Sequence, residues 1–236
     1  MGLAPTSTDL AAGAAHFAET GWLLTQTLDA DGVAELRRWL DEIASWPDDG
    51  DGWMHHRELT DARPQLCRSE DLIPFHAGLR ALLTTGPMLE TASALLGEPA
   101  VLYKEKVNYK LPGGAGYAPH QDAPAYPFID NHVSCMVAVD DATPANGCLE
   151  VVGGRHHEVL ATDAGGCVHP DLVASFEWRA GGVGAGWNPW VYFHPPPPIG
   201  PQGCKGPCYF RRCGAPPRTP ASGPPPADRP SHPMDL

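Results

Sequence analysis

The placement of proline divides this chain into two unequal parts. Of the 27 prolines in 236 residues, 15 fall between residues 189 and 236. Proline lacks a backbone N–H, and its ring is excluded from helix interiors and from central strands. We therefore predict one folded domain over residues 1–188, incomplete at its C-terminal end, and a largely disordered, Pro-rich tail over residues 189–236.

The first hundred residues predict helices with a strand between them. An apolar stripe at spacings of three and four residues predicts a helix that Asp31 caps and Pro47 ends. The stripe consists of Val33, Leu36, Leu40 and Ile43. Further helices are expected over residues 72–83 and 87–96, the second closed by Gly97, with a strand over residues 22–28. Together with the strand-like runs that follow, this pattern predicts an α+β class.

The triplet His120-Gln121-Asp122 carries the clearest chemical signal. Residues two apart in a strand point to the same face, so the imidazole of His120 and the carboxylate of Asp122 can reach one metal ion. They would supply two ligands of a 2-His-1-carboxylate triad, which leaves coordination positions open on Fe(II). A strand-like run and a Gly-rich turn before the triplet favour a metal site over a chance occurrence.

The run before the triplet alternates two kinds of side chain. One face carries cations and an amide: Lys104, Lys106, Asn108 and Lys110. The other face carries Tyr103, Glu105, Val107 and Tyr109. A solvated edge strand guarded by lysines would explain this alternation. We favour an inward-facing set of cations for anionic ligands, because the strand leads into His120 and because Tyr103 and Val107 would then pack against the N-terminal helices.

Residues 103–160 resemble the phytanoyl-CoA dioxygenase family. The similarity lies in the basic strand and Pro-Gly turn over residues 104–114, the His-Gln-Asp triplet, the Asn146-Gly147 turn and the loop Gly153-Gly154-Arg155-His156. That loop stands where the family has Pro-Gly-Ser-His. The basic strand, with Arg68-Ser69-Glu70 upstream, is similar to bacterial members that act on small polar substrates, including 2-aminoethylphosphonate dioxygenases.

The resemblance implies an Fe(II)/2-oxoglutarate-dependent dioxygenase that hydroxylates a small, anionic metabolite. Its fold would be a double-stranded β-helix, the jelly-roll form of cupin-like barrels, with flanking N-terminal helices. The cofactors would be Fe(II), 2-oxoglutarate as cosubstrate and O2, and 2-oxoglutarate would leave as succinate and CO2. His120 and Asp122 would hold the metal. Gln121 and the face of Lys106, Asn108 and Lys110 would orient the cosubstrate.

The distal part of the family pattern is altered in this chain. The family has a second ligand histidine there, followed further on by an arginine for the far carboxylate of 2-oxoglutarate. Aligning Phe193 with the family strand places Ile199 at the ligand position, and isoleucine cannot bind iron. His194 is the nearest alternative ligand, although four prolines follow it and are expected to keep it out of any sheet. Arg211 or Arg212 lies near the expected arginine.

The codons offer one explanation of this break. Pro198-Ile199-Gly200 is encoded by CCN-ATH-GGN, and reading one nucleotide earlier gives CAT-CGG, or His-Arg, when both variable bases are C. We hypothesise a dioxygenase frame to about residue 180 and a shifted frame beyond it. The chain would then be a catalytically impaired member, a pseudoenzyme or binding protein that lacks the distal ligand. A third hypothesis is a cupin-like hydrolase or isomerase that uses the metal pair without 2-oxoglutarate.

Composition restricts the partners. The net charge of −12 argues against nucleic acid, which is bound through basic patches. The sequence has no run of 18 apolar residues and no signal-peptide pattern, so we expect no membrane span and a cytoplasmic location. Seven irregularly spaced cysteines do not indicate a disulfide framework. A small-molecule substrate is the expected partner, and the oligomeric state is left open.

Overall fold

The computed structural model describes residues 10–180 apart from short gaps, and the backbone alone for strands at 179–180, 190–194 and 208–212. The gaps are at 49, 51, 61–62, 110, 112–116, 123, 125, 127, 130 and 141–147. Lys110, Ile199 and most of the predicted tail therefore lie outside the described residues.

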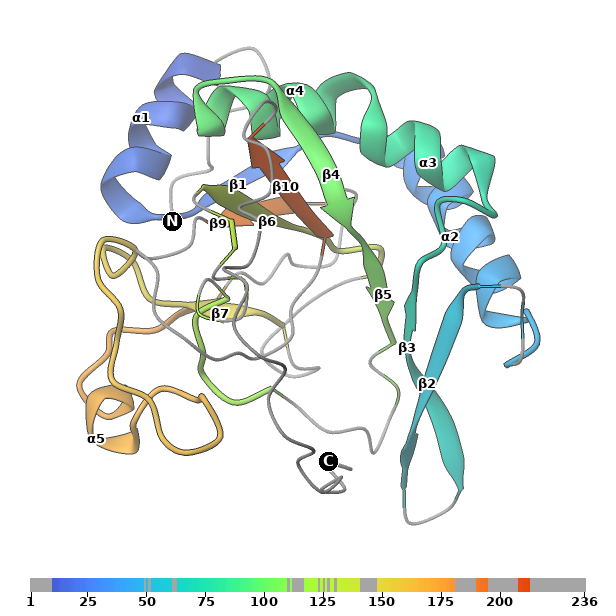
Figure 1. Ribbon diagram of the computed structural model, residues 1–236. Helices are drawn as coiled ribbons and strands as arrows, with labels where there is room; N and C mark the ends of the chain where they lie inside the picture. The colour runs from blue at the N-terminus through green and yellow to red at the C-terminus, as the bar shows by residue number, and fades with distance from the viewer. Residues whose placement is uncertain are drawn as a thin grey trace, which may run out of the picture.

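Helices cover one side of a central sheet (Figure 1). They are α1 (Leu10–Thr20), α2 (Ala30–Ala44), α3 (Ala77–Thr84) and α4 (Gly86–Leu96), whereas the short α5 (Pro170–Val173) lies apart from them. The α4 helix contacts α1, α3 and three strands of the sheet, and the core between these layers includes Leu23, Met88 and Val133. None of the helices in the described part of the chain has the length and apolarity needed to span a bilayer.

The α2 helix confirms the predicted stripe, since Leu36 and Ile43 are buried. Its cap was predicted wrongly. Asp29 rather than Asp31 caps the helix, because the Asp29 carboxylate accepts a hydrogen bond of 2.8 Å from the backbone N–H of Gly32. Aspartate is a preferred N-cap residue at either position, so only the backbone conformation decides which of the two caps the helix.

The α3 helix begins later than predicted, and α4 ends as predicted. His76 caps α3 by accepting a hydrogen bond of 2.9 Å from the N–H of Leu79, so residues 72–75 form a turn before the helix instead of its first turn. Gly97 ends α4 with a φ of 73°, the left-handed conformation that favours glycine.

The strands form antiparallel sheets, which together with the helices confirms the α+β class. The five-stranded sheet has the order β1 (Leu23–Gln26), β9 (Trp190–His194), β6 (His132–Val137), β10 (Cys208–Arg212), β4 (Ala100–Lys104). The three-stranded sheet has the order β2 (Met54–Leu59), β3 (Pro64–Glu70), β5 (Lys106–Asn108). The last two strands, β7 (Glu150–Val151) and β8 (Arg179–Ala180), pair with each other. The β2–β3 hairpin was not among the predicted strands.

Two strands lie within the segment that was predicted to be a tail. The expectation that residues 189–236 contain no central strand is wrong for β9 and β10, which are both interior strands of the five-stranded sheet. The reason is the clustering of the prolines: β9 ends at His194, immediately before the first of four, and β10 begins after Pro207. A residue before proline is driven toward the extended conformation, which suits the last position of a strand.

The chain passes from one sheet to the other at Glu105, between β4 and β5. The buried Glu105 carboxylate accepts hydrogen bonds from the N–H groups of Leu72 and of Ile73, the latter at 3.1 Å. The crossing interrupts the predicted alternation. Val107 packs against the core as predicted, whereas the Tyr103 ring lies 5.7 Å from the Tyr126 ring and not against the N-terminal helices.

Candidate active site

The structure brings His120 and Asp122 together. His120 Nε2 lies 3.6 Å from Asp122 Oδ1, so a single ion could contact both atoms. The Asp122 side chain is 2% exposed and the His120 side chain 20%, which gives the pair one buried and one accessible side. The pair can therefore supply an imidazole nitrogen and a carboxylate oxygen to a metal approached from solvent.

A backbone carbonyl fixes the state of the His120 ring. Nδ1 lies 2.7 Å from the carbonyl oxygen of Ala118, which can only accept a hydrogen bond, so Nδ1 carries the proton. Nε2 then faces Asp122, and in the neutral ring it offers its lone pair to a metal. Burial lowers the pKa of His120, but its contacts with Asp122 and Ala118 outweigh burial and raise that pKa above its ordinary value.

Ser134 orients the carboxylate of Asp122. The Ser134 hydroxyl lies on the buried strand β6 and donates a hydrogen bond of 2.8 Å to Asp122 Oδ2. This contact directs Oδ2 toward the sheet and Oδ1 toward His120. A partner of this kind around metal ligands tunes both their orientation and their affinity.

Replacing Ser134 by alanine is expected to weaken Fe(II) binding by about 10- to 100-fold while the chain stays folded, because the carboxylate loses the donor that aims it. Anaerobic titration with Fe(II), with thermal unfolding as the check on folding, measures this effect. Ser175→Ala is the matched control, since the Ser175 hydroxyl donates only to the Leu172 carbonyl at the surface. An unchanged affinity in the Ser134 variant would show that Ser134 has no part in the site.

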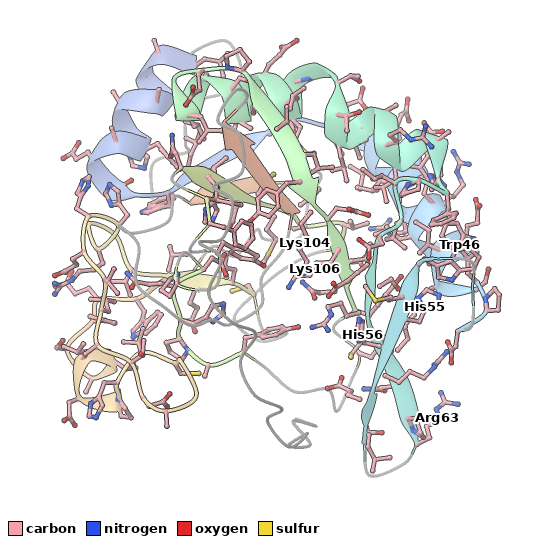
Figure 2. The ribbon with its side chains drawn as sticks, viewed as in Figure 1. Trp46, His55, His56, Arg63, Lys104 and Lys106 are labelled. Carbon is pink, nitrogen blue, oxygen red and sulfur yellow. The ribbon has the colours of Figure 1, made fainter. Side chains whose placement is uncertain are left out.

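A cluster of cations lies next to the metal pair. Lys106 is 5% exposed, and within the described part of the chain its ammonium has no hydrogen-bond partner. Burial is the main cause that lowers the pKa of Lys106 to about 7, and Asp122, Arg68, Glu70 and Lys104 are all close enough to act on it electrostatically. The burial of Lys106 agrees with the predicted inward face, whereas the Lys104 side chain is 28% exposed and contacts Glu70; Figure 2 labels both lysines.

The other predicted cosubstrate residues have different positions. The Gln121 amide donates to the carbonyls of Arg155 and Glu158 and accepts from the N–H of Leu160 at 2.9 Å. The Gln121 amide therefore holds the loop after β7, and its role at the cosubstrate stays a prediction. Asn108 accepts a hydrogen bond of 3.4 Å from the Tyr117 hydroxyl, at the edge of the cluster.

A third metal ligand is not found among the side chains that the structure describes, where no three His, Cys, Asp or Glu groups converge on one point. The backbone of β9, however, pairs with β6 in a register that places His194 directly opposite Ser134. The predicted exclusion of His194 from any sheet is thus wrong. Its backbone lies one strand away from the residue that orients Asp122.

Sequence reasoning missed three functional candidates. Arg68 and Glu70 were noted only as part of a family-like segment, and Ser134 was not singled out. The signal in the sequence was a pair of charged residues two positions apart, Arg68 and Glu70. The structure buries both of them, since Glu70 is 6% exposed and the Arg68 side chain 12%. Buried charges are rare without a partner or a function.

Comparison with known proteins gives a consistent picture. The family model described as phytanoyl-CoA dioxygenase (PhyH) matches residues 17–164. A methylphosphonate hydroxylase from Gimesia maris is 48% identical over 163 residues, which are 68% of this chain and 63% of that protein. A 2-aminoethylphosphonate dioxygenase from an uncultured bacterium is 37% identical over 157 residues, 64% of this chain and 60% of that protein. The chain thus spans less than two thirds of the length of these relatives.

Solved structures share the overall fold. AviO1 from Streptomyces viridochromogenes superposes with a TM-score of 0.59 at 22% identity, over 89% of this chain and 97% of that one. The epimerase SnoN, solved with Fe3+, alpha ketoglutarate and nogalamycin RO, superposes with a TM-score of 0.61 at 21% identity, over 87% of this chain and 84% of that one. At such identities the likeness concerns the fold alone.

Proposed function

The chain belongs to the phytanoyl-CoA dioxygenase family, and from that premise we propose that it is an Fe(II)/2-oxoglutarate-dependent dioxygenase acting on a small phosphonate. The observation that carries the proposal is the His120–Asp122 pair, with Nε2 and Oδ1 3.6 Å apart and each side chain held by its own hydrogen bond. We assign its five-stranded sheet to one half of a double-stranded β-helix, the jelly-roll core expected for such an enzyme.

The residues present fit Fe(II). A neutral imidazole and a carboxylate are two of the three ligands of the facial triad, and both are already oriented. His194 is the proposed third ligand, because the backbone register sets it opposite Ser134 on the neighbouring strand. The iron, when bound with 2-oxoglutarate, supplies the oxidising chemistry with O2. The protein supplies ligand geometry, charge and exclusion of water.

The substrate class follows from the charge around the pair. Lys106 is buried, and Arg68 and Lys104 lie beside it, so the site carries more cationic than anionic side chains on that side. A buried excess of positive charge is costly unless an anion binds there. Both 2-oxoglutarate and a phosphonate meet this requirement, and two relatives are named for phosphonates. We assign Lys106 to 2-oxoglutarate.

Replacing Lys106 by methionine is expected to stabilise the folded chain by about 2 kcal/mol near pH 6, because it removes a buried ammonium group. It should also weaken 2-oxoglutarate binding about 10-fold, because the cosubstrate loses its cation. Burial lowers the pKa of Lys106 in the folded protein to about 7, from an ordinary value of 10.5. The buried charge of Lys106 therefore destabilises the folded protein fully below pH 7, and this destabilisation fades as the pH rises toward 10.5. The gain in stability should shrink over that same window.

Thermal unfolding from pH 6 to 9, with calorimetry of 2-oxoglutarate binding, measures both effects. Arg38→Met is the control, since Arg38 is largely exposed on α2. A Lys106 variant that is less stable than the parent at pH 6, or that binds 2-oxoglutarate equally well, would contradict this assignment.

The proposed reaction is tested by succinate formation. The full chain with Fe(II), 2-oxoglutarate and O2 should form succinate faster when methylphosphonate or 2-aminoethylphosphonate is added. The uncharged dimethyl ester of methylphosphonate should give no such stimulation. Iron-loaded protein that forms no succinate with any of these compounds would overturn the proposed function.

A further inference from the structure

We infer that Glu70 is a positioning residue that holds Arg68 and Lys104 side by side as a receptor for the anionic group of the substrate. This inference rests on the proposed function and adds to it the place where the phosphonate binds. Arg68 and Glu70 lie on β3, Lys104 ends β4, and Glu70 is paired in register with Lys106 on β5. Figure 2 labels Lys104 and Lys106 where β4 leads into β5, and His56, whose Nε2 lies 3.9 Å from Glu70 Oε1, on the hairpin.

One carboxylate bridges two cations from different strands. Glu70 Oε1 lies 2.6 Å from Arg68 Nε, and Glu70 Oε2 lies 3.2 Å from Lys104 Nζ. The Glu70 side chain is 8% exposed, so these contacts are shielded from water. Burial raises the pKa of Glu70, but Lys104, Arg68 and Lys106 outweigh burial and lower that pKa below its ordinary value. Glu70 is thus held as a carboxylate between its two partners.

Both Glu70 oxygens are engaged, so Glu70 acts through its partners and does not itself contact the substrate. The contact uses Nε of Arg68, the nitrogen nearest the side-chain stem, and one of the three donors of the Lys104 ammonium. The pair keeps one net positive charge after Glu70 is counted. A planar guanidinium beside an ammonium suits the tetrahedral oxygens of a phosphonate.

The receptor lies within reach of the metal pair. Lys106 feels the charges of Asp122 and of Arg68, Glu70 and Lys104, so the metal pair and the receptor both lie close to Lys106. A phosphonate on Arg68 and Lys104 would therefore direct its carbon toward the metal pair, with Lys106 left for the cosubstrate. The phosphonate would then bind Arg68 and Lys104, and 2-oxoglutarate would bind Lys106.

A purely electrostatic role and a positioning role of Glu70 predict opposite effects of Glu70→Gln on anion binding. If Glu70 only adds negative charge, its loss should tighten the binding of an anion. If Glu70 holds the receptor in place, its loss should release both cations and weaken phosphonate binding about 10-fold or more. We expect the second result, with the 2-oxoglutarate and Fe(II) dissociation constants changed less than about 3-fold, since those ligands use other residues.

The experiment is calorimetry on the full chain with methylphosphonate, 2-aminoethylphosphonate and inorganic phosphate as probes, without oxygen. Glu70→Asp, which keeps the charge, should recover part of the lost affinity. Lys104→Met should weaken the probes similarly, and in that background Glu70→Gln should have a smaller effect than in the parent. Glu90→Gln on the exposed side of α4 is the matched control and should change nothing.

The outcomes separate this inference from the proposed function. Unchanged or tighter binding of the probes by folded Glu70→Gln overturns the positioning role, even if the parent chain turns over a phosphonate. If Glu70→Gln does not fold, strictly additive effects of Lys104→Met and Glu70→Asp overturn it. A parent chain that binds none of the three probes overturns the receptor, and a parent chain that binds them but forms no succinate contradicts the proposed function alone.

Discussion

Replacing Asp122 by asparagine, or His120 by alanine, is expected to abolish Fe(II) binding and to lower 2-oxoglutarate turnover by about 1,000-fold or more. Asparagine keeps the volume of Asp122 and can still accept the hydrogen bond from Ser134, so the buried position stays filled. The variant removes only the carboxylate charge. Because the His120 side chain is partly exposed, alanine there leaves no large cavity.

Anaerobic titration with Fe(II) and a succinate assay measure these losses, with thermal unfolding as the check on folding. His157→Ala is the matched control, since His157 is exposed and its ring contacts the ring of His156. Iron affinity equal to that of the parent chain in both the Asp122 and the His120 variants would show that this pair does not hold metal.

Replacing His194 by alanine is expected to lower turnover by about 1,000-fold or more while Fe(II) still binds weakly. The proposed triad would lose its third ligand and keep the two that the structure places together. Retention of weak iron binding distinguishes this variant from the Asp122 and His120 variants. The measurement is succinate formation at saturating Fe(II) and fixed oxygen.

Turnover by His194→Ala equal to that of the parent chain would contradict the assignment of His194. The shifted-frame hypothesis predicts another pattern, with slow turnover by the parent chain that the alternative-frame translation of residues 182–236 restores. Ile199→His alone would not restore it, because errors of about 1 Å in the position of a ligand already cost about 100-fold.

Local patterns predicted the parts of the site that depend on neighbouring residues. His120 and Asp122 lie two apart in the sequence, so their convergence was predictable without the rest of the chain, although the structure has a bend at Asp122 in place of the expected strand. The glycine at the end of α4 and the buried stripe of α2 were predictable for the same reason. Each depends on a spacing of at most a few residues.

Contacts between distant segments were not predictable. Glu70 and Lys104 are 34 positions apart in the sequence and meet because β5, which follows β4 in the chain, pairs with β3. The pairing of β9 with β6 likewise joins residues far apart in sequence, and proline content counted over a whole segment concealed the proline-free stretch at residues 190–194. The crossing at Glu105 reversed the surroundings of Tyr103 because a strand that changes sheets does not continue one alternation.

Turnover under 18O2 tests the central claim most directly. With Fe(II), 2-oxoglutarate and methylphosphonate, a dioxygenase should place one oxygen atom of O2 in succinate and the other in the hydroxylated phosphonate, with one CO2 released for each. Mass spectrometry of both products reads the label. Labelled succinate together with labelled product is the expected result. Conversion of methylphosphonate without succinate, or without label in either product, would contradict the assignment as a 2-oxoglutarate-dependent dioxygenase.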